Sequence, residues 1–198
     1  MKRSLWGVVL AGLVLLAACG AEKLIEKPAG EMNLRLEDLG ASYRLEQEKS
    51  LPDLLEMLHL EESPGFLEAS LRVFTGVLSE TGDISPSVAL IAAVLRCDSS
   101  GGAQAALQDI RTHIEGGLRM QDAGLQVEKR EPPQLVEGEI EVDFARATVR
   151  TGESYLLLFR RRNVLGFLVT AGPAGAFSEE QVIDLARKMA GRVPLPQP

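Results

Sequence analysis

The sequence has few of the residues that build catalytic and metal centres. Its 198 residues include two histidines and two cysteines. The histidines, His59 and His113, lie far apart, and each falls in a predicted helix with no second histidine or cysteine at helical spacing. No HExxH, CxxC or GxSxG pattern occurs. The sequence therefore predicts no metal site, no cofactor and no catalytic residues, and it does not favour an enzyme.

An excess of positive charge is also missing, since 28 acidic side chains face 21 basic ones and the formal net charge is -7. That balance repels phosphate backbones, so nucleic acid is not an expected partner. The one basic cluster is Arg160, Arg161 and Arg162, beside a predicted hairpin turn at Arg162 and Asn163. We interpret the cluster as a solvated turn, with recognition of an anionic ligand or partner as the alternative.

The apolar run of residues 5–18 is too short to cross a bilayer as a helix. It would cover about 21 Å, whereas the hydrocarbon core is about 30 Å thick. It follows Lys2 and Arg3, and this order of a positive start and a short apolar core is typical of a signal peptide.

The apolar core ends in Leu16, Ala17, Ala18 and Cys19. These residues resemble the lipobox of bacterial lipoproteins, and the resemblance covers only residues 1–20. It implies cleavage between Ala18 and Cys19, a diacylglyceryl group on the Cys19 thiol and often a further acyl chain on the new amino group. It also implies an extracytoplasmic, membrane-anchored location in the cell envelope. The alternative is an ordinary secretory signal in which Cys19 is incidental.

Removing the signal peptide takes away Lys2 and Arg3 and leaves a net charge of -9, so attachment to the membrane would depend on lipid. Residues 19–31 have little apolar periodicity and are expected to form a flexible tether spanning roughly 17 to 21 Å. With Cys19 acylated, Cys97 is the only thiol left and no disulfide is expected. Cys97 ends an apolar run, so we predict a buried thiol, with a reactive one as the alternative.

Residues 32–193 are expected to form one globular domain, followed by a frayed tail at 194–198. Apolar periodicity predicts strands at 43–49, 67–75, 88–97, 125–131, 139–149, 154–161 and 164–171. It predicts helices at 51–60, from Ser99 or Ser100 to about residue 115, and at 178–192. The fold class is α+β: a mainly antiparallel sheet of about six or seven strands with two helices packed on one face. This layout loosely resembles the helix-backed sheets of bacterial lipoproteins and sensor-type extracytoplasmic domains.

Two further patterns have simple structural readings. The loop from Gly172 to Gly175 precedes a predicted helix and could bind an anion, although a plain strand-to-helix connection is favoured. The acids Glu137, Glu139, Glu141 and Asp143 alternate along a predicted strand and are expected on its water-facing side.

Three hypotheses for function remain. The first is a non-enzymatic binding domain with an apolar small ligand between sheet and helices, in a cavity lined by Leu107, Ile110, Val182 and Met189. The second is a structural or sensory envelope protein that contacts a protein partner through an exposed sheet face. The third is an enzyme that uses scattered carboxylates or Cys97.

Overall fold

One antiparallel sheet of seven strands forms the centre of the protein. The computed structural model describes residues 23–57, 65–76, 88–121, 126–149 and 152–195. The strands are β1 Tyr43–Ser50, β2 Phe66–Gly76, β3 Val88–Cys97, β4 Gln126–Lys129, β5 Glu141–Val149, β6 Gly152–Arg161 and β7 Val164–Gly172. They lie in the order β1-β2-β3-β7-β6-β5-β4, and every neighbouring pair is antiparallel. The predicted α+β class and the seven-stranded antiparallel sheet are confirmed.

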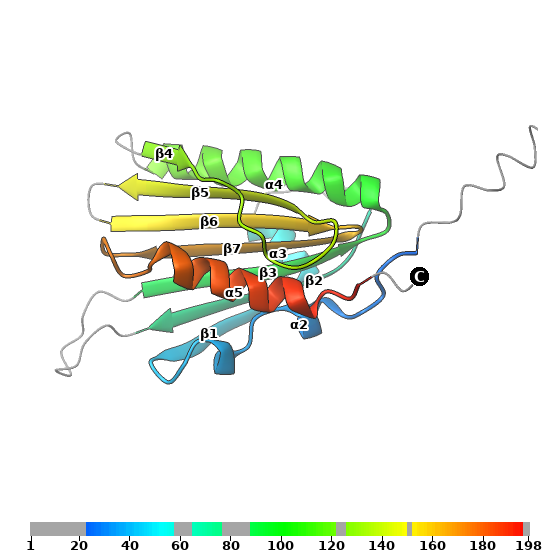
Figure 1. Cartoon of the computed structure of the whole chain (residues 1–198), viewed down its shortest axis with the longest axis horizontal. Coiled ribbons are helices and arrows are strands. Elements are labelled where there is room, and N and C mark those ends of the chain that lie inside the picture. The colour runs from blue at the N-terminus through cyan, green and yellow to red at the C-terminus, as the bar shows by residue number, and fades with distance from the viewer. Residues whose placement is uncertain (1–22, 58–64, 77–87, 122–125, 150–151, 196–198) are drawn as a thin grey trace, which may run out of the picture.

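The chain builds the sheet from two meanders, each followed by a long helix (Figure 1). Strands β1 to β3 precede α4, Ser100–Gln121, and strands β4 to β7 precede α5, Glu179–Arg192. The meanders join where β3 pairs with β7, so the most apolar strands occupy the middle of the sheet. Shorter helical segments are α2 Ala29–Met32, the 3-10 turn η1 Leu36–Asp38 and α3 Leu51–Met57.

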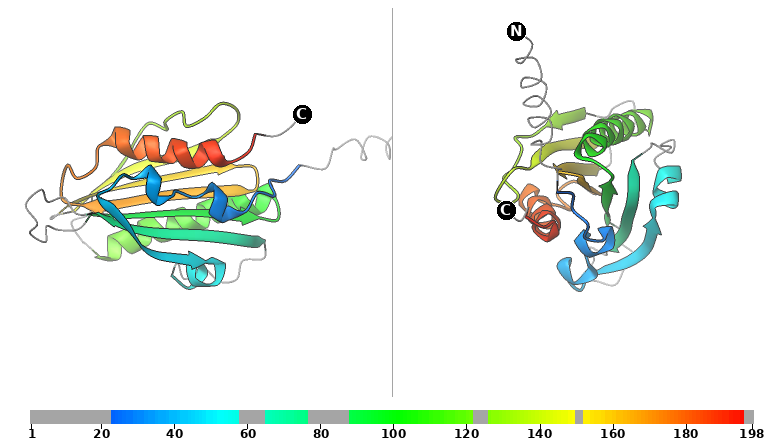
Figure 2. Two further views of the ribbon diagram at one scale, coloured as in Figure 1. Left: turned by 90° about the horizontal axis from the view of Figure 1, so that it is seen from below. Right: turned by 90° about the vertical axis from the view of Figure 1, so that its right-hand side faces the viewer.

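The two long helices cover opposite faces of the sheet, and the prediction that both pack on one face is wrong (Figure 2). Helix α5 packs with Leu157 and Phe159 of β6, whereas α4 packs with Leu156 and Leu158 of the same strand. Successive strand residues point to opposite faces, so β6 contributes to two separate cores. The central strands are apolar on both sides and therefore need a layer on each face.

Helix α4 continues past the predicted stop at Gly116 and Gly117 and ends at Gln121. Its start agrees with the prediction, because Ser99 Oγ accepts a hydrogen bond from Gly102 N at 3.0 Å. Each interior glycine costs a helix about 1 kcal/mol. The packing of Leu107, Ile110 and other apolar residues of α4 against the sheet offsets that cost.

The predicted tether is shorter than expected, because residues before 32 belong to the fold. Ile25, Ala29 and Met32 are buried in the core on the α5 side of the sheet. Pro28, Gly30 and the charged residues between these side chains masked the signal in the sequence. Cys19 and Ala18 lie outside the described residues, as do His59 and residues 196–198. Within the described ranges, no helix is long and apolar enough to span a membrane.

An ion pair between Asp38 and Arg192 links the segment before β1 to α5. Arg192 donates from Nη1 and Nη2 to the two carboxylate oxygens of Asp38, each at 2.8 Å. Burial would raise the pKa of Asp38, but hydrogen bonds from Arg192 and from the Arg35 backbone outweigh it and hold the pKa below its usual value. The positive charges of Arg192 and Lys188 act in the same direction.

We expect the protein to lose stability in acid through this pair. A lowered folded-state pKa adds stability that is complete above the unfolded pKa, about 3.9, and disappears as the pH falls through the folded-state value. Asp38→Asn should cost about 2 kcal/mol at pH 7 and flatten the decline of the urea midpoint between pH 5 and pH 3. Glu37→Gln, at an exposed neighbouring position, is the matched control and should keep the wild-type slope. An Asp38→Asn profile parallel to wild type would contradict the assignment.

Candidate functional site

The apolar cavity expected between sheet and helices is not formed by the residues proposed for it. Leu107 and Ile110 lie in the core under α4, while Val182 and Met189 lie in the core under α5, on the other side of the sheet. All four side chains are buried, and each pair packs in the core on its own side of the sheet. They cannot line a common pocket.

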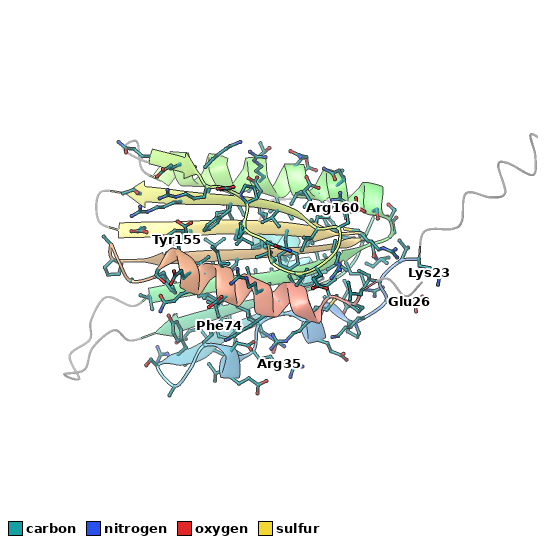
Figure 3. The ribbon with its side chains drawn as sticks, in the orientation of Figure 1. Lys23, Glu26, Arg35, Phe74, Tyr155 and Arg160 are labelled. Carbon is teal, nitrogen blue, oxygen red and sulfur yellow. The ribbon has the colours of Figure 1, made fainter. Side chains whose placement is uncertain are left out.

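A pocket of about 480 Å³ lies instead at the end of the β6–β7 hairpin. Residues 160–162 supply one wall, residues 138–141 of the segment entering β5 supply another, and Ser100 and Leu195 complete it. We call this the Arg161 pocket. The pocket contains the arginine cluster, Glu139 and Glu141 of the predicted row of acids, and Leu195 of the carboxyl-terminal segment. The labels of Arg160 and Lys23 in Figure 3 mark this end of the molecule.

Arg161 is the buried charge of the pocket. It follows Leu157 and Phe159 on the α5 face of β6, and it is 3% exposed. Its Nη2 donates to Glu137 O at 2.9 Å and its Nη1 to Val193 O at 3.4 Å. Desolvation lowers the pKa of its guanidinium, and the neighbouring charge of Arg162 lowers it further. No carboxylate of the described residues forms a salt bridge with Arg161, whereas Arg72, Arg96, Arg146 and Arg160 of the strands each pair with a glutamate.

The backbone over Arg161 requires a glycine. Gly138 has φ of +90°, a backbone conformation that residues other than glycine rarely adopt. A Cβ atom there would also lie 3.1 Å from Arg161 Nη2. The turn at Gly138 therefore brings the backbone against the guanidinium and exposes Glu139 at the rim of the pocket.

Arg160 points to the opposite face and is already paired. Its Nε lies 2.9 Å from Glu141 Oε2, and Gln104 of α4 donates to the other oxygen of Glu141 at 3.4 Å. Asp143 pairs with Arg111 of α4 at 3.0 Å. The predicted water-facing row of acids is therefore wrong in two respects: β5 begins only at Glu141, and its two acids lie along α4.

The same hairpin turn fixes the point where the chain enters the fold. Asn163, 1% exposed, accepts a hydrogen bond from Ile25 N at 2.8 Å and donates to Ile25 O at 3.2 Å and to Cys97 O at 2.9 Å. Arg162, with φ of 53°, donates to Lys23 O at 2.5 Å. We call residues 23–28 the entry segment. It is held at its first described residues, beside the Arg161 pocket.

The remaining candidates have structural roles. Cys97 is 1% exposed, and burial together with the charge of Asp98 raises its pKa to about 11, so the buried-thiol interpretation is confirmed. The loop from Gly172 to Gly175 connects β7 to α5, whose first turn is capped by the side chains of Ser178 and Gln181 as predicted. His113 lies in α4, and the described residues contain no group of three or more His, Cys, Asp or Glu suited to a metal ion.

Comparison with known proteins identifies the fold. No protein-family model matches the chain, and no curated protein matches its sequence. The extracellular domain of PknH from Mycobacterium tuberculosis has a similar structure, with a TM-score of 0.56 and 10% identity over 87% of this chain and 98% of that chain. A putative uncharacterized protein of Mycobacterium smegmatis, an Rv0999 ortholog, has a TM-score of 0.35 and 15% identity over 81% of this chain and 84% of that chain. The first likeness is one of fold alone.

Proposed function

We propose that this chain is a lipid-anchored, extracytoplasmic binding domain that acts without catalysis. It is attached through acylated Cys19 and uses the Arg161 pocket as its binding site. The observation that carries the proposal is that the entry segment and the pocket share one end of the molecule. The lipobox-like residues 16–19 support the anchor, and a fold shared with the extracellular domain of PknH supports the location.

The short connection between anchor and fold sets the orientation. Four residue steps separate Cys19 from Lys23, whose carbonyl is bound by Arg162. Fully extended, they reach roughly 14 Å. The end of the sheet that carries the pocket would therefore stay close to the lipid headgroups, and the end that carries the Gly172–Gly175 loop would point away.

Two labelled positions test this orientation on the full acylated protein in vesicles. Leu195, 61% exposed, lies at the pocket end, and Ala174 is exposed in the loop after β7 at the other end. The nine residues of β7 separate the two ends by about 30 Å. Single Leu195→Cys and Ala174→Cys variants would carry a fluorophore, since buried Cys97 with its pKa of about 11 labels slowly.

A nitroxide on the lipid headgroup should quench the label at position 195 several-fold more than the label at position 174. Mass spectrometry of the native protein should find acyl mass on an amino terminus at Cys19, and Cys19→Ser should remove that mass and release the protein from membranes. Equal quenching of the two labels would contradict the orientation. Native protein without acyl mass would contradict the anchor.

The second hypothesis, binding of a protein partner through an open sheet face, has less support. Helices cover both faces of the central strands, and exposed strand residues are concentrated on the edge strands β1 and β4. The charged residues of β1, such as Arg44 and Glu48, oppose edge-to-edge pairing with another strand.

A further inference from the structure

We infer that the Arg161 pocket binds a small ligand through an oxyanion, a carboxylate or a phosphate group. The inference rests on the proposed binding function and names the chemistry of the ligand. It comes from a buried cation without a counter-ion beside an open pocket. Other arginines of the strands are each paired with a glutamate, and Arg161 is not.

A buried guanidinium is costly unless an anion or several acceptors compensate it. Arg72, Arg96, Arg146 and Arg160 each have a glutamate within 3.2 Å. Arg161 is more buried than any of them but has only two backbone carbonyls. One of these is the carbonyl of Val193 at the carboxyl end of α5, where the helix dipole supplies a partial negative charge. Compensation is therefore partial.

The unused donors of Arg161 fit an oxyanion. A guanidinium has five N–H groups in a planar fork that matches carboxylate and phosphate oxygens. Two are used by the carbonyls of Glu137 and Val193. Arg161 is one of the lining residues, and a Cβ atom on Gly138 of the same lining would lie 3.1 Å from its Nη2, which places the guanidinium within reach of an anion in the pocket. Arg162, half-buried in the same wall, adds a second positive charge.

Acidic groups in the pocket limit the affinity without removing the positive charge. Glu141 is bound by Arg160 and Gln104, so its negative charge is largely compensated. Glu139 is exposed at the rim, and its charge opposes an incoming anion. The apolar side chains of Ile140 and Leu195 in the same lining would contact a hydrocarbon portion of the ligand. A volume of about 480 Å³ suits a small molecule.

The test compares a charged probe with its neutral isostere on the full chain, purified in a non-ionic sugar detergent. Octanoate should bind at least tenfold more tightly than octanamide, by isothermal titration, and added salt should reduce the difference. Inorganic phosphate tests a free anion, and dihexanoyl phosphatidylglycerol tests a lipid headgroup. Whichever of these binds more tightly assigns the source of the oxyanion.

Variants that remove a positive or a negative charge from the pocket provide matched tests. Arg161→Gln should abolish the preference for octanoate, and Arg162→Gln, at a less buried position, should weaken octanoate about threefold. Glu139→Gln should tighten octanoate about threefold. The effect of Arg162→Gln and Glu139→Gln in opposite directions would hold even if Arg161→Gln unfolded the protein.

Equal binding of octanoate and octanamide would overturn the inference and leave the pocket as a binding site of another chemistry. Absence of binding by octanoate, phosphate and the lipid together would also overturn it. The label positions and the acyl mass test the proposed function separately, because neither measurement depends on the ligand.

Discussion

Replacing Gly166 with alanine is expected to lower the free energy of unfolding by about 3 kcal/mol, near the top of the usual range for overpacked cores. A Cβ atom on Gly166 would lie 2.2 Å from Cζ and 2.3 Å from Cε1 of Phe159. The two residues are directly opposite in the β6–β7 pair, and Phe159 is 1% exposed. The ring rests on the glycine, and the methyl group would displace it into a filled core.

An effect of the opposite sign also operates at this position. Alanine restricts the unfolded chain more than glycine does, which stabilises a protein by about 0.4 to 1 kcal/mol where the site has room. That gain is smaller than the cost of moving a buried aromatic ring. Urea denaturation of wild type and Gly166→Ala would measure the difference, provided that both show a single transition.

Gly116→Ala is the control for the same chemical change in open space. Nothing lies within 4 Å of a Cβ atom at Gly116, which is exposed in the interior of α4, so this variant should gain about 1 kcal/mol. In a double-mutant cycle, Phe159→Leu should recover part of the loss caused by Gly166→Ala. A Gly166→Ala protein as stable as wild type would show that the ring has another place to lie.

Local sequence patterns predicted the secondary structure well because strand and helix periodicities are local. The predicted strand at 88–97 coincides with β3, and the predicted turn at Arg162 and Asn163 joins β6 to β7. The capping box of α5 was visible as Ser178 and Gln181. Errors at Gly116 and Gly117 arose because tertiary packing outweighs the helix propensity of two residues.

The layering was harder to predict because it depends on contacts between distant segments. An amphipathic helix shows which of its own faces is buried but not which face of a sheet it covers. The signal available was the two-sided apolar composition of β3 and β7, which requires cover on both faces. Applied to α4 and α5, that requirement would have separated the two helices.

The candidate site was only partly predictable. The arginine cluster was recognised, and recognition of an anion was one of its two interpretations. What the sequence could not show is that Arg161 is buried beside Glu137 O, or that Asn163 binds Ile25 across 138 positions of the chain. These contacts depend on where the segments before β1 and before β5 pass over the sheet, and both segments lie largely outside strands and long helices.

Asn163→Ala is expected to cost about 3 kcal/mol in global stability and to release the entry segment. The amide of Asn163 makes three buried hydrogen bonds, and its loss leaves Ile25 N, Ile25 O and Cys97 O without those partners. Each unsatisfied buried group costs about 1 to 3 kcal/mol. Water can reach the two Ile25 groups if the segment detaches, so each of the three groups should cost close to the lower limit of about 1 kcal/mol.

Two measurements separate global from local effects of Asn163→Ala. Urea denaturation gives the loss of stability, and hydrogen exchange at the Ile25 amide reports whether the entry segment opens under native conditions. Arg162→Gln, which removes only the exposed bond to Lys23 O, is the matched control and should change stability by less than about 0.5 kcal/mol. Protection of Ile25 equal to wild type would contradict the role assigned to Asn163.

Release of the entry segment would also change the geometry at the membrane. With Ile25 free, the next buried position is Ala29, so ten residue steps instead of four separate Cys19 from the fold. Their maximum reach is roughly 35 Å, against roughly 14 Å in the wild type. In an Asn163→Ala background, headgroup quenching of the label at position 195 should therefore fall toward that at position 174. If the proposed anchor is correct, one buried amide sets how closely the Arg161 pocket is held to the lipid surface.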